Sequence, residues 1–329
     1  MKTSRLLLTI LFVLLNSIAF AGWGDKTETI TFKSYTAKDY ADVIDGISDN
    51  PEVQVFGKLI IPKSDDKLPA MIIVHGSGGP QEKDNFWIKA FHKSGIATLQ
   101  LNCFKPRKVK STIGKQEEVS QASMIIDAYN ALRELSDHPS IDRDKIGIIG
   151  SSKGGMVALM TAWNPIIKIL GELKFAVHIA LYPFCYYYEK YDFTGAPILI
   201  LLGEKDEWTG SEPCVDFGIK LKEIKYTIKV IVYRDSYHAF DANYSVRTTN
   251  KAHSYSKCRL YMDKDGVEIS PQCKSDSNDP SFIDSLDCCR EKKPIKYGRN
   301  IKAKKMALKE VQTLLYNVFK INKVAQKSE

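Results

Sequence analysis

The segment Gly150-Ser151-Ser152-Lys153-Gly154-Gly155 constrains the fold of this chain more than any other stretch. It follows the apolar run 146–149 and precedes the apolar, helix-like run 156–160. A buried strand that turns directly into a helix, with glycines on both sides of a serine, is typical of a nucleophile elbow. The glycines are expected where strand and helix crowd each other, and the serine backbone is expected to be strained. Ser152 is therefore the predicted nucleophile.

A Gly-x-Ser-x-Gly pattern also occurs by chance in glycine-containing loops, so its surroundings decide its meaning. Segments 28–35 and 53–61 alternate apolar and polar residues, which favours an antiparallel pair at a sheet edge. Apolar runs and helical patterns then follow one another along the chain, which predicts an α/β fold with a mostly parallel sheet and right-handed crossovers. The predicted buried strands are 69–74, 96–101, 146–149, 175–181, 197–202 and 228–233, and the clearest predicted helices are 86–93 and 119–135.

The amino-terminal segment has the pattern of a secretory signal peptide. Residues 1–5 are basic, residues 6–20 are mostly apolar, and Ala19-Phe20-Ala21 is an A-x-A cleavage site before Gly22. We expect residues 1–21 to be removed and residues 22–329 to form one exported domain, periplasmic or secreted. A retained amino-terminal anchor is the alternative. After cleavage we expect no stable membrane span.

The charge of the chain does not predict a nucleic-acid partner. The formal net charge is +8 over 329 residues, and two of the basic residues, Lys2 and Arg5, belong to the predicted signal peptide. The remainder is spread without a block of like charge until the lysine-rich end. With 44% apolar residues, the chain can bury a large core as one domain.

A glycine-rich loop, His75-Gly76-Ser77-Gly78-Gly79-Pro80, follows the first predicted buried strand. Glycines at this place let backbone amides approach a bound carbonyl and stabilise an oxyanion. We expect the backbone N–H groups of Ser77, Gly78 and Lys153 to do so, and His75 to hold the loop in place. An ordinary glycine turn at the end of a strand is the alternative.

An acid and a histidine follow the later predicted strands. Asp206 lies in the turn 203–209 after strand 197–202, with Glu204 and Glu207 as alternatives, and His238 follows strand 228–233. A nucleophile, an orienting acid and a general base occur in this chain order on a parallel sheet, each after a strand. The order therefore predicts these roles for Ser152, Asp206 and His238. Such a site uses neither a metal nor a cofactor.

The chain contains the motifs HGSGGP, Phe104-Lys105-Pro106-Arg107, GSSKGG, GEKDEWT with Pro213-Cys214, and YHAFD. Taken together, these motifs resemble the dienelactone hydrolase family, over about residues 50–243 and again at 297–319. The resemblance implies an α/β-hydrolase fold and an acyl-hydrolase triad of Ser152, Asp206 and His238. The founding members carry a cysteine where this chain has Ser152, which favours general ester hydrolysis over lactone opening. Residues of about 243–294 form an insertion before the carboxy-terminal helix.

The predicted function is that of an exported serine hydrolase that cleaves small-molecule carboxylic esters or lactones through an acyl-enzyme. The alternatives are a serine peptidase of prolyl-oligopeptidase type and a catalytically idle exported binding protein. Two residues are candidates for substrate binding. Arg107 would pair with a substrate carboxylate, although a surface salt bridge explains it equally well, and Trp208 is the second candidate.

The seven cysteines predict disulfides in an exported protein. Cys258, Cys273, Cys288 and Cys289 lie in the polar insertion, where we expect two disulfides, with all three pairings open. Zinc binding is the alternative, but the spacings lack a paired CxxC pattern. Cys185 and Cys214 form a candidate third pair, which leaves Cys103 free. The insertion would either cover the pocket as a lid or decorate its rim.

Overall fold

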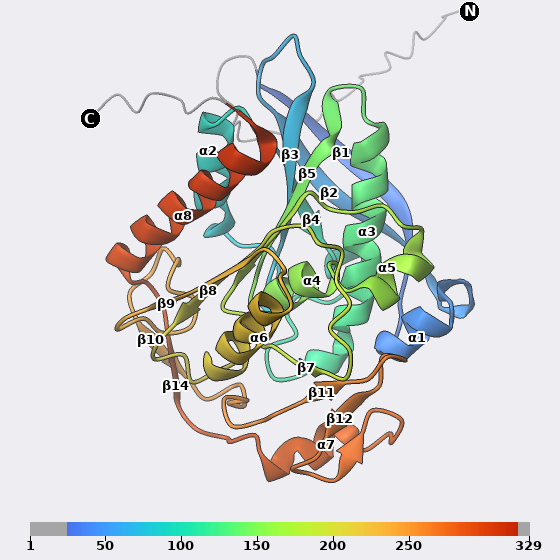
Figure 1. Ribbon diagram of the computed structural model, residues 1–329, viewed down its shortest axis with the longest axis vertical. Coiled ribbons are helices and arrows are strands. Elements are labelled where there is room, and N and C mark those ends of the chain that lie inside the picture. Colours follow the sequence, from blue (N-terminus) through green and yellow to red (C-terminus); the bar gives the residue numbers. More distant parts are fainter. Residues whose placement is uncertain (1–24, 322–329) are drawn as a thin grey trace, which may run out of the picture.

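The computed structural model describes residues 25–321, so the predicted signal peptide lies outside the described residues. Within them, the main feature is a twisted eight-stranded sheet (Figure 1). Its first two neighbouring pairs are antiparallel and the other pairs are parallel. In spatial order the strands are β1 (Lys26–Tyr35), β2 (Glu52–Ile61), β4 (Ala97–Asn102), β3 (Leu68–Val74), β5 (Ile141–Ser151), β6 (Val177–Leu181), β8 (Ile198–Gly203) and β9 (Ile228–Tyr233).

The sheet is apolar on both faces because alternate residues of each central strand point to opposite sides. Ile72 of β3 and Ile148 of β5 belong to one hydrophobic core. Their neighbours Met71 and Ile149 belong to the core on the opposite face. The predicted α/β-hydrolase fold, with a mostly parallel sheet flanked by helices, is confirmed.

Helices cover both faces of the sheet (Figure 1). Apolar residues of α3 and α4 fill one core, and those of α2 and α8 fill the other. Helix α3 begins two residues later than the apolar pattern predicts because the Ser120 side chain accepts a hydrogen bond from the backbone N–H of Ser123 and caps it. The helices are α1 (Tyr40–Asp45), α2 (Asp84–Lys93), α3 (Gln121–Asp137), α4 (Lys153–Met160), α5 (Asn164–Leu170), α6 (Glu212–Glu223), α7 (Phe282–Ser285) and α8 (Ile301–Phe319).

None of the helices in residues 25–321 combines the length and the apolar character that a membrane crossing requires.

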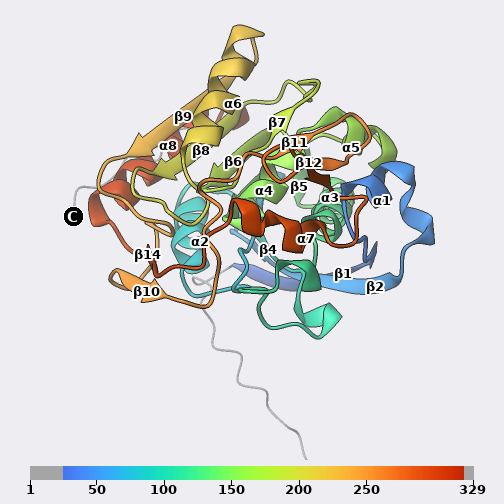
Figure 2. The ribbon, with the colours of Figure 1, turned by 90° about the horizontal axis from the view of Figure 1, so that it is seen from below.

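The insertion has little regular structure. Strand β10 (Arg247–Thr249) pairs with β14 (Ile295–Tyr297) where the insertion begins and ends. Between them, β11 (Tyr261–Met262), β12 (Glu268–Ser270) and β13 (Ser275–Asp276) form a small sheet with β7 (Tyr187–Tyr188) of the main domain. Seen from below, α7 crosses in front of α4 (Figure 2).

Disulfides hold the insertion together, as the sequence predicts. Cys258 pairs with Cys289, and Cys273 pairs with Cys288. The candidate third pair, Cys185–Cys214, is also present, and Cys103 is free and buried. The sulfur atoms of Cys273, Cys288 and Cys289 lie close to one another, but because all three are in disulfides they are not available as thiolate ligands for zinc.

Candidate active site

Ser152 lies at a sharp turn between β5 and α4, with φ 54° and ψ −118°. This backbone conformation is strained for a residue with a side chain. A Cβ atom at Gly150 would lie 1.9 Å from the Gly154 carbonyl oxygen, and one at Gly154 would lie 2.3 Å from the Val74 carbonyl oxygen. The Ser152 N–H donates to the Leu181 carbonyl at 2.8 Å. The turn thus requires both glycines and is held by the neighbouring strand.

The structure brings the three predicted side chains into one hydrogen-bonded chain. The Nε2 atom of His238 lies 2.9 Å from Oγ of Ser152, and its Nδ1 atom lies 2.7 Å from Oδ2 of Asp206. The other carboxylate oxygen, Oδ1, accepts from the backbone N–H groups of Trp208 at 2.9 Å and Thr209 at 3.2 Å. Each member follows a parallel strand, β5, β8 or β9, so all three meet at the carboxyl end of the sheet.

The electrostatics of Asp206 fix the state of the histidine. Burial raises the pKa of Asp206, but the adjacent His238 ring and the N–H groups of Trp208 and Thr209 outweigh it, so the pKa lies below its ordinary value. A charged carboxylate accepts a hydrogen bond and cannot donate one. Nδ1 of His238 therefore carries a proton, and in the neutral form of this ring the Nε2 lone pair faces the Ser152 hydroxyl.

The two alternative acids do not reach the histidine. Glu204 is exposed and accepts from the backbone N–H of Asp235 at 2.9 Å. Glu207 is exposed and lies 3.2 Å from the Lys293 ammonium. Asp206 is the acid that the fold places beside His238.

The glycine-rich loop lies beside Ser152. Ser77 and Lys153 line the same cavity as Ser152, and Gly78 lines an adjoining cavity together with Ser152 and His238. Lys153 is the first residue of α4, so its N–H has no acceptor within the helix and remains available for an oxyanion. A Cβ atom at Gly76 would lie 2.9 Å from the Ser151 carbonyl oxygen, which explains why this loop needs glycine to approach the elbow.

His75 has the structural role that its position predicts. Its Nδ1 atom lies 2.9 Å from the Gly76 carbonyl oxygen, and its Nε2 atom accepts from the Cys103 N–H at 3.2 Å. Burial lowers the pKa of His75 to about 4. The ring is therefore neutral at pH 7, and both nitrogens are used to hold the loop.

With the elbow, the hydrogen-bonded chain and the glycine loop in place, comparison with known proteins decides the family. The model of the dienelactone hydrolase family matches residues 56–262, more than half of the chain. The chain belongs to the dienelactone hydrolase family. It is thus a hydrolase of the α/β-hydrolase superfamily, as the sequence motifs predict.

Individual relatives are more distant. A probable 2-oxo-3-(5-oxofuran-2-ylidene)propanoate lactonase from Bradyrhizobium sp. is 26% identical over 232 residues, covering 66% of this chain and 87% of the relative. The fold matches a dienelactone hydrolase-like promiscuous phosphotriesterase from metagenomic libraries with TM-score 0.52 and 13% identity, over 88% of this chain and 98% of that one. A thermophilic esterase from Thermogutta terrifontis matches with TM-score 0.46 and 17% identity, over 64% of this chain and 83% of the esterase.

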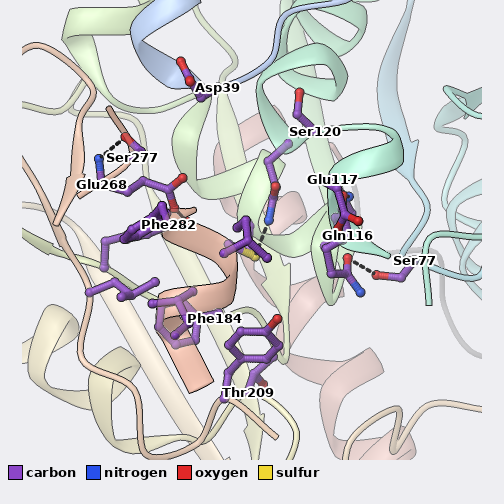
Figure 3. A pocket seen from close by; sticks show the side chains of 18 of the residues that line it. Asp39, Ser77, Gln116, Glu117, Ser120, Phe184, Thr209, Glu268, Ser277 and Phe282 are labelled. Atoms are coloured by element: carbon purple, nitrogen blue, oxygen red, sulfur yellow. Dashed lines mark hydrogen bonds between the residues drawn. The ribbon is translucent and has the colours of Figure 1, made fainter. Parts of the chain in front are cut away.

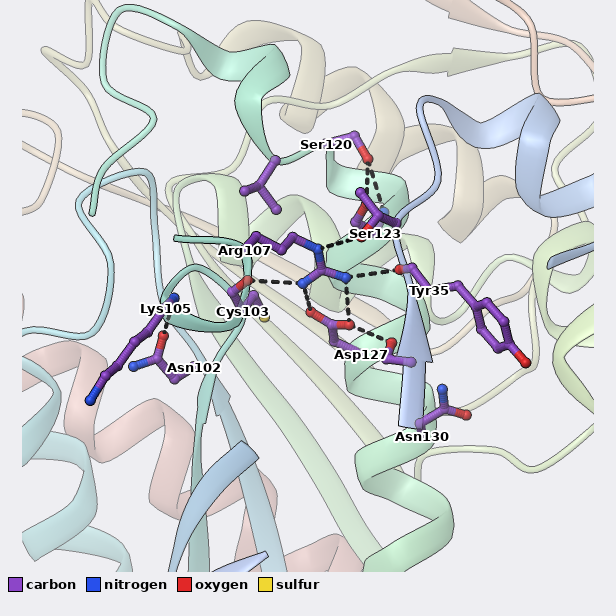
Figure 4. Close-up of polar contacts among 12 residues, drawn as sticks. Tyr35, Asn102, Cys103, Lys105, Arg107, Ser120, Ser123, Asp127 and Asn130 are labelled. Carbon is purple, nitrogen blue, oxygen red and sulfur yellow. Dashed lines mark hydrogen bonds and ion pairs between the residues drawn. The ribbon is translucent and has the colours of Figure 1, made fainter. Parts of the chain in front are cut away.

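Arg107 does not line either cavity beside Ser152, which corrects the prediction from sequence. Its guanidinium donates to both carboxylate oxygens of Asp127, at 2.7 and 3.0 Å (Figure 4). It also donates to the Cys103 and Tyr35 carbonyls. Only 6% of the Arg107 side chain is exposed and Asp127 is fully buried, so the pair is also not a surface salt bridge. Arg107 instead ties the segment after β4 to α3 and the end of β1.

The cavity beside Ser152 has a volume of about 210 Å³. Trp208, the second candidate for substrate binding, lines it and lies with its ring centroid 5.0 Å from that of His238. One wall comes from the insertion, which the sequence placed over the pocket or at its rim without naming any residue that lines it (Figure 3). The only signal in the sequence is a few apolar residues in an otherwise polar segment. Besides aromatic residues with a polar group, the apolar lining consists of Met156, Phe184, Leu260, Pro280, Phe282, Ile283 and Leu286.

The charged lining of the cavity is mostly acidic. Glu268 of the insertion accepts from the Tyr186 hydroxyl at 2.5 Å, and burial raises its pKa to about 7. The lining acids are Asp39, Glu117, Glu268 and Asp279, and the lining bases are Lys38 and Lys153.

Both bases have partners. Lys38 lies 3.7 Å from Asp39. The buried Lys153 ammonium group donates to the Gln116 carbonyl at 2.6 Å and to the Val119 carbonyl. Burial lowers the pKa of Lys153 to about 7, although Glu117 acts in the opposite direction. The lysine thus fastens the elbow to the 116–119 segment.

Proposed function

We propose that the mature chain is an exported serine hydrolase that cleaves uncharged carboxylic esters with an apolar group, through Ser152, His238 and Asp206. The observation that carries the proposal is the continuous chain from the Ser152 hydroxyl through His238 to Asp206, with separations of 2.9 and 2.7 Å. A nucleophile, a base and an orienting acid in this geometry are the parts that acyl transfer requires.

The geometry suggests the following reaction. Nε2 of His238 removes the proton of Ser152 as the serine oxygen attacks the ester carbonyl, and Asp206 stabilises the imidazolium that forms. The N–H groups of Ser77, Gly78 and Lys153 stabilise the oxyanion. His238 then gives its proton to the leaving alcohol, and water hydrolyses the acyl-enzyme by the same steps. Each amide donor contributes about 10²- to 10³-fold to such a rate.

The pocket supports an uncharged substrate. The acids repel a carboxylate on the side of Ser152 that faces the insertion, and Arg107, which the sequence offered as a carboxylate partner, is bound to Asp127. The Bradyrhizobium relative is named for a lactone that carries a carboxylate. We infer that the present chain prefers neutral esters over such substrates, with the apolar group against the wall formed by Phe184, Leu260 and Phe282.

The disulfides support export. Stable disulfides form in oxidising compartments and are rare in the cytosol of most organisms. The three pairs involving residues 185–289 agree with the secretory signal that the sequence predicts for residues 1–21.

A fluorophosphonate probe tests the proposed function. The purified mature protein is expected to be labelled on Ser152, and Ser152→Ala is expected to abolish both labelling and ester hydrolysis while the melting temperature stays unchanged. Ser136→Ala is the matched control, because Ser136 lies on α3 and donates only to the Leu132 carbonyl within its own helix. An unlabelled wild-type protein, or equal labelling of Ser152→Ala, would contradict the proposal.

A further inference from the structure

Tyr182 directly follows β6 and has an unusual backbone. Its φ is 41°, a left-handed conformation that bulky residues rarely adopt, and 1% of its surface is exposed. Its N–H donates to the Leu201 carbonyl at 2.8 Å. Strained backbone of this kind persists only where its surroundings enforce it, and it gathers at functional sites. The strain points to a role for this side chain in the adjacent active site.

The hydroxyl group of Tyr182 joins two buried charges. It accepts from the Lys83 ammonium at 3.0 Å and donates to Oδ1 of Asp241 at 2.6 Å. Lys83 also donates to the Ser151 hydroxyl at 2.8 Å, and Asp241 also accepts from the Trp87 indole N–H at 2.9 Å. One hydrogen-bonded network therefore extends from the residue before Ser152 to the segment after His238.

The ring and the backbone of Tyr182 contact the other two members of the site. The ring packs edge-on against the His238 imidazole, with centroids 4.6 Å apart and planes at 64°. The Tyr182 carbonyl oxygen lies 3.4 Å from the Thr209 hydroxyl, which is 3.1 Å from Oδ2 of Asp206. Tyr182 thus contacts His238 directly, and it is linked to the residue before Ser152 through Lys83 and to Asp206 through Thr209.

We propose that Tyr182 is a positioning residue that fixes the His238 ring against Ser152, with its own ring held in place by Lys83 and Asp241. Lys83, Tyr182 and Asp241 are all buried, and buried charges are stable only when they are fully hydrogen-bonded. The network therefore has one favourable arrangement, and it sets the plane of the Tyr182 ring. That ring in turn limits rotation of the imidazole, so that Nε2 stays within hydrogen-bonding distance of the serine.

The inference rests on the proposed serine hydrolase function, and the rate of fluorophosphonate labelling tests both separately. Tyr182→Phe keeps the ring and removes the hydroxyl, so we expect labelling about tenfold slower, which is less than the roughly hundredfold that a 1 Å displacement costs. Tyr182→Leu removes the ring as well and should be slower again. In ester hydrolysis the same variants should lower kcat and leave KM unchanged.

A matched control separates positioning from stability. Tyr129 is also fully buried, and its hydroxyl accepts from the Leu173 N–H, away from the site. Tyr129→Phe should lower the melting temperature to a similar extent and leave the labelling rate of folded protein unchanged.

A double-mutant cycle tests the network itself. Lys83→Met and Tyr182→Phe should each slow labelling about tenfold, and the double variant should be no slower than either, because they disrupt one unit. An unlabelled wild type would end the proposed function. If the wild type is labelled and both Tyr182→Phe and Tyr182→Leu are labelled as fast as the wild type, the positioning role of Tyr182 is wrong and the proposed function still stands.

Discussion

The two sides of the candidate active site are built in different ways. Ser152, Asp206 and His238 follow strands of a parallel sheet that is buried on both faces. The opposite wall of the pocket comes from the insertion, whose strands are two or three residues long and which two disulfides hold together.

This contrast separates two tasks. Reacting atoms must be held to within a fraction of an ångström, and packed strands do this well. The shape of an apolar pocket tolerates more variation, because one methylene group changes binding by only about 1–3 kcal/mol. The sheet is therefore expected to set the chemistry, and the insertion is expected to set the selectivity.

The sharpest test removes the charge of the acid on the sheet side. Asp206→Asn should lower kcat by about 10⁴-fold, because the His238 tautomer that accepts the serine proton loses its support. The ratio of kcat/KM for hexanoate and acetate esters should stay the same, because the insertion is untouched. A loss below tenfold would show that Asp206 does not orient the histidine.

A second test concerns the support of the sheet. Arg107→Ala leaves the Asp127 carboxylate buried and unpaired, which should cost about 3–5 kcal/mol in the free energy of unfolding. Urea denaturation measures this cost. The preference for neutral over carboxylate-bearing esters should not change, and a changed preference would place Arg107 back in substrate recognition.

Acid should weaken the sheet side through His178, which lies in β6. Burial lowers the pKa of His178 from 6.5 to about 4, despite its hydrogen bond to the Ala158 carbonyl. The unfolded chain binds a proton below pH 6.5 and the folded chain does so only near pH 4, so stability falls across this window. At about 1.4 kcal/mol per pH unit the loss is about 3 kcal/mol. Urea denaturation from pH 7 to 4 should show a smaller loss for His178→Asn.

Loss of one disulfide in the insertion should change which esters the protein prefers but not how fast Ser152 reacts. Cys273 and Cys288 are separated by 15 residues, and a loop of this size is stabilised by about 3 kcal/mol when it is closed. The Cys273→Ser, Cys288→Ser double variant should label with fluorophosphonate as fast as wild type. Its preference for longer acyl chains should fall, and an equal fall in labelling would contradict the division of tasks.

The smallest effect is expected from a single side chain of the wall. Phe282→Ala removes an apolar contact in the pocket, and kcat/KM for a hexanoate ester should fall about tenfold while that for acetate changes little. Ile219→Ala is the control, because Ile219 lies exposed on α6 outside the pocket. Equal losses for both esters would remove Phe282 from chain-length selectivity.

The sequence predicted the sheet side well because its signals are local. The elbow glycines around Ser152 and the positions of Asp206 and His238 after strands can be identified from short segments. Export and the catalytic roles of these residues stay predictions. The Cys185–Cys214 pair and the presence of two disulfides in the insertion agree with the prediction. Which cysteine of the insertion bonds to which was left open, because it depends on how the insertion folds.

The errors arise from contacts between distant segments. The sequence offers Arg107 a substrate carboxylate or a surface salt bridge, and both are wrong because its buried partner, Asp127, lies within an apolar helix 20 residues away. Ser123, Asp127 and Asn130 place polar groups on the buried side of α3, where they meet the end of β1 and the residues after it. That polar stripe on α3 was the feature of the sequence that could have indicated a buried partner for Arg107. The pocket wall had no comparable signal, because its position depends on where the insertion folds back.

The insertion enters and leaves the main domain at neighbouring points, since β10 pairs with β14 residue by residue from Arg247–Tyr297 to Thr249–Ile295. A segment anchored in this way can change in length and sequence during evolution while its two ends stay where they are. For protein engineering, residues 250–294 are thus a natural unit of exchange: replacing them by the corresponding segment of another relative would give the same reacting groups a different pocket.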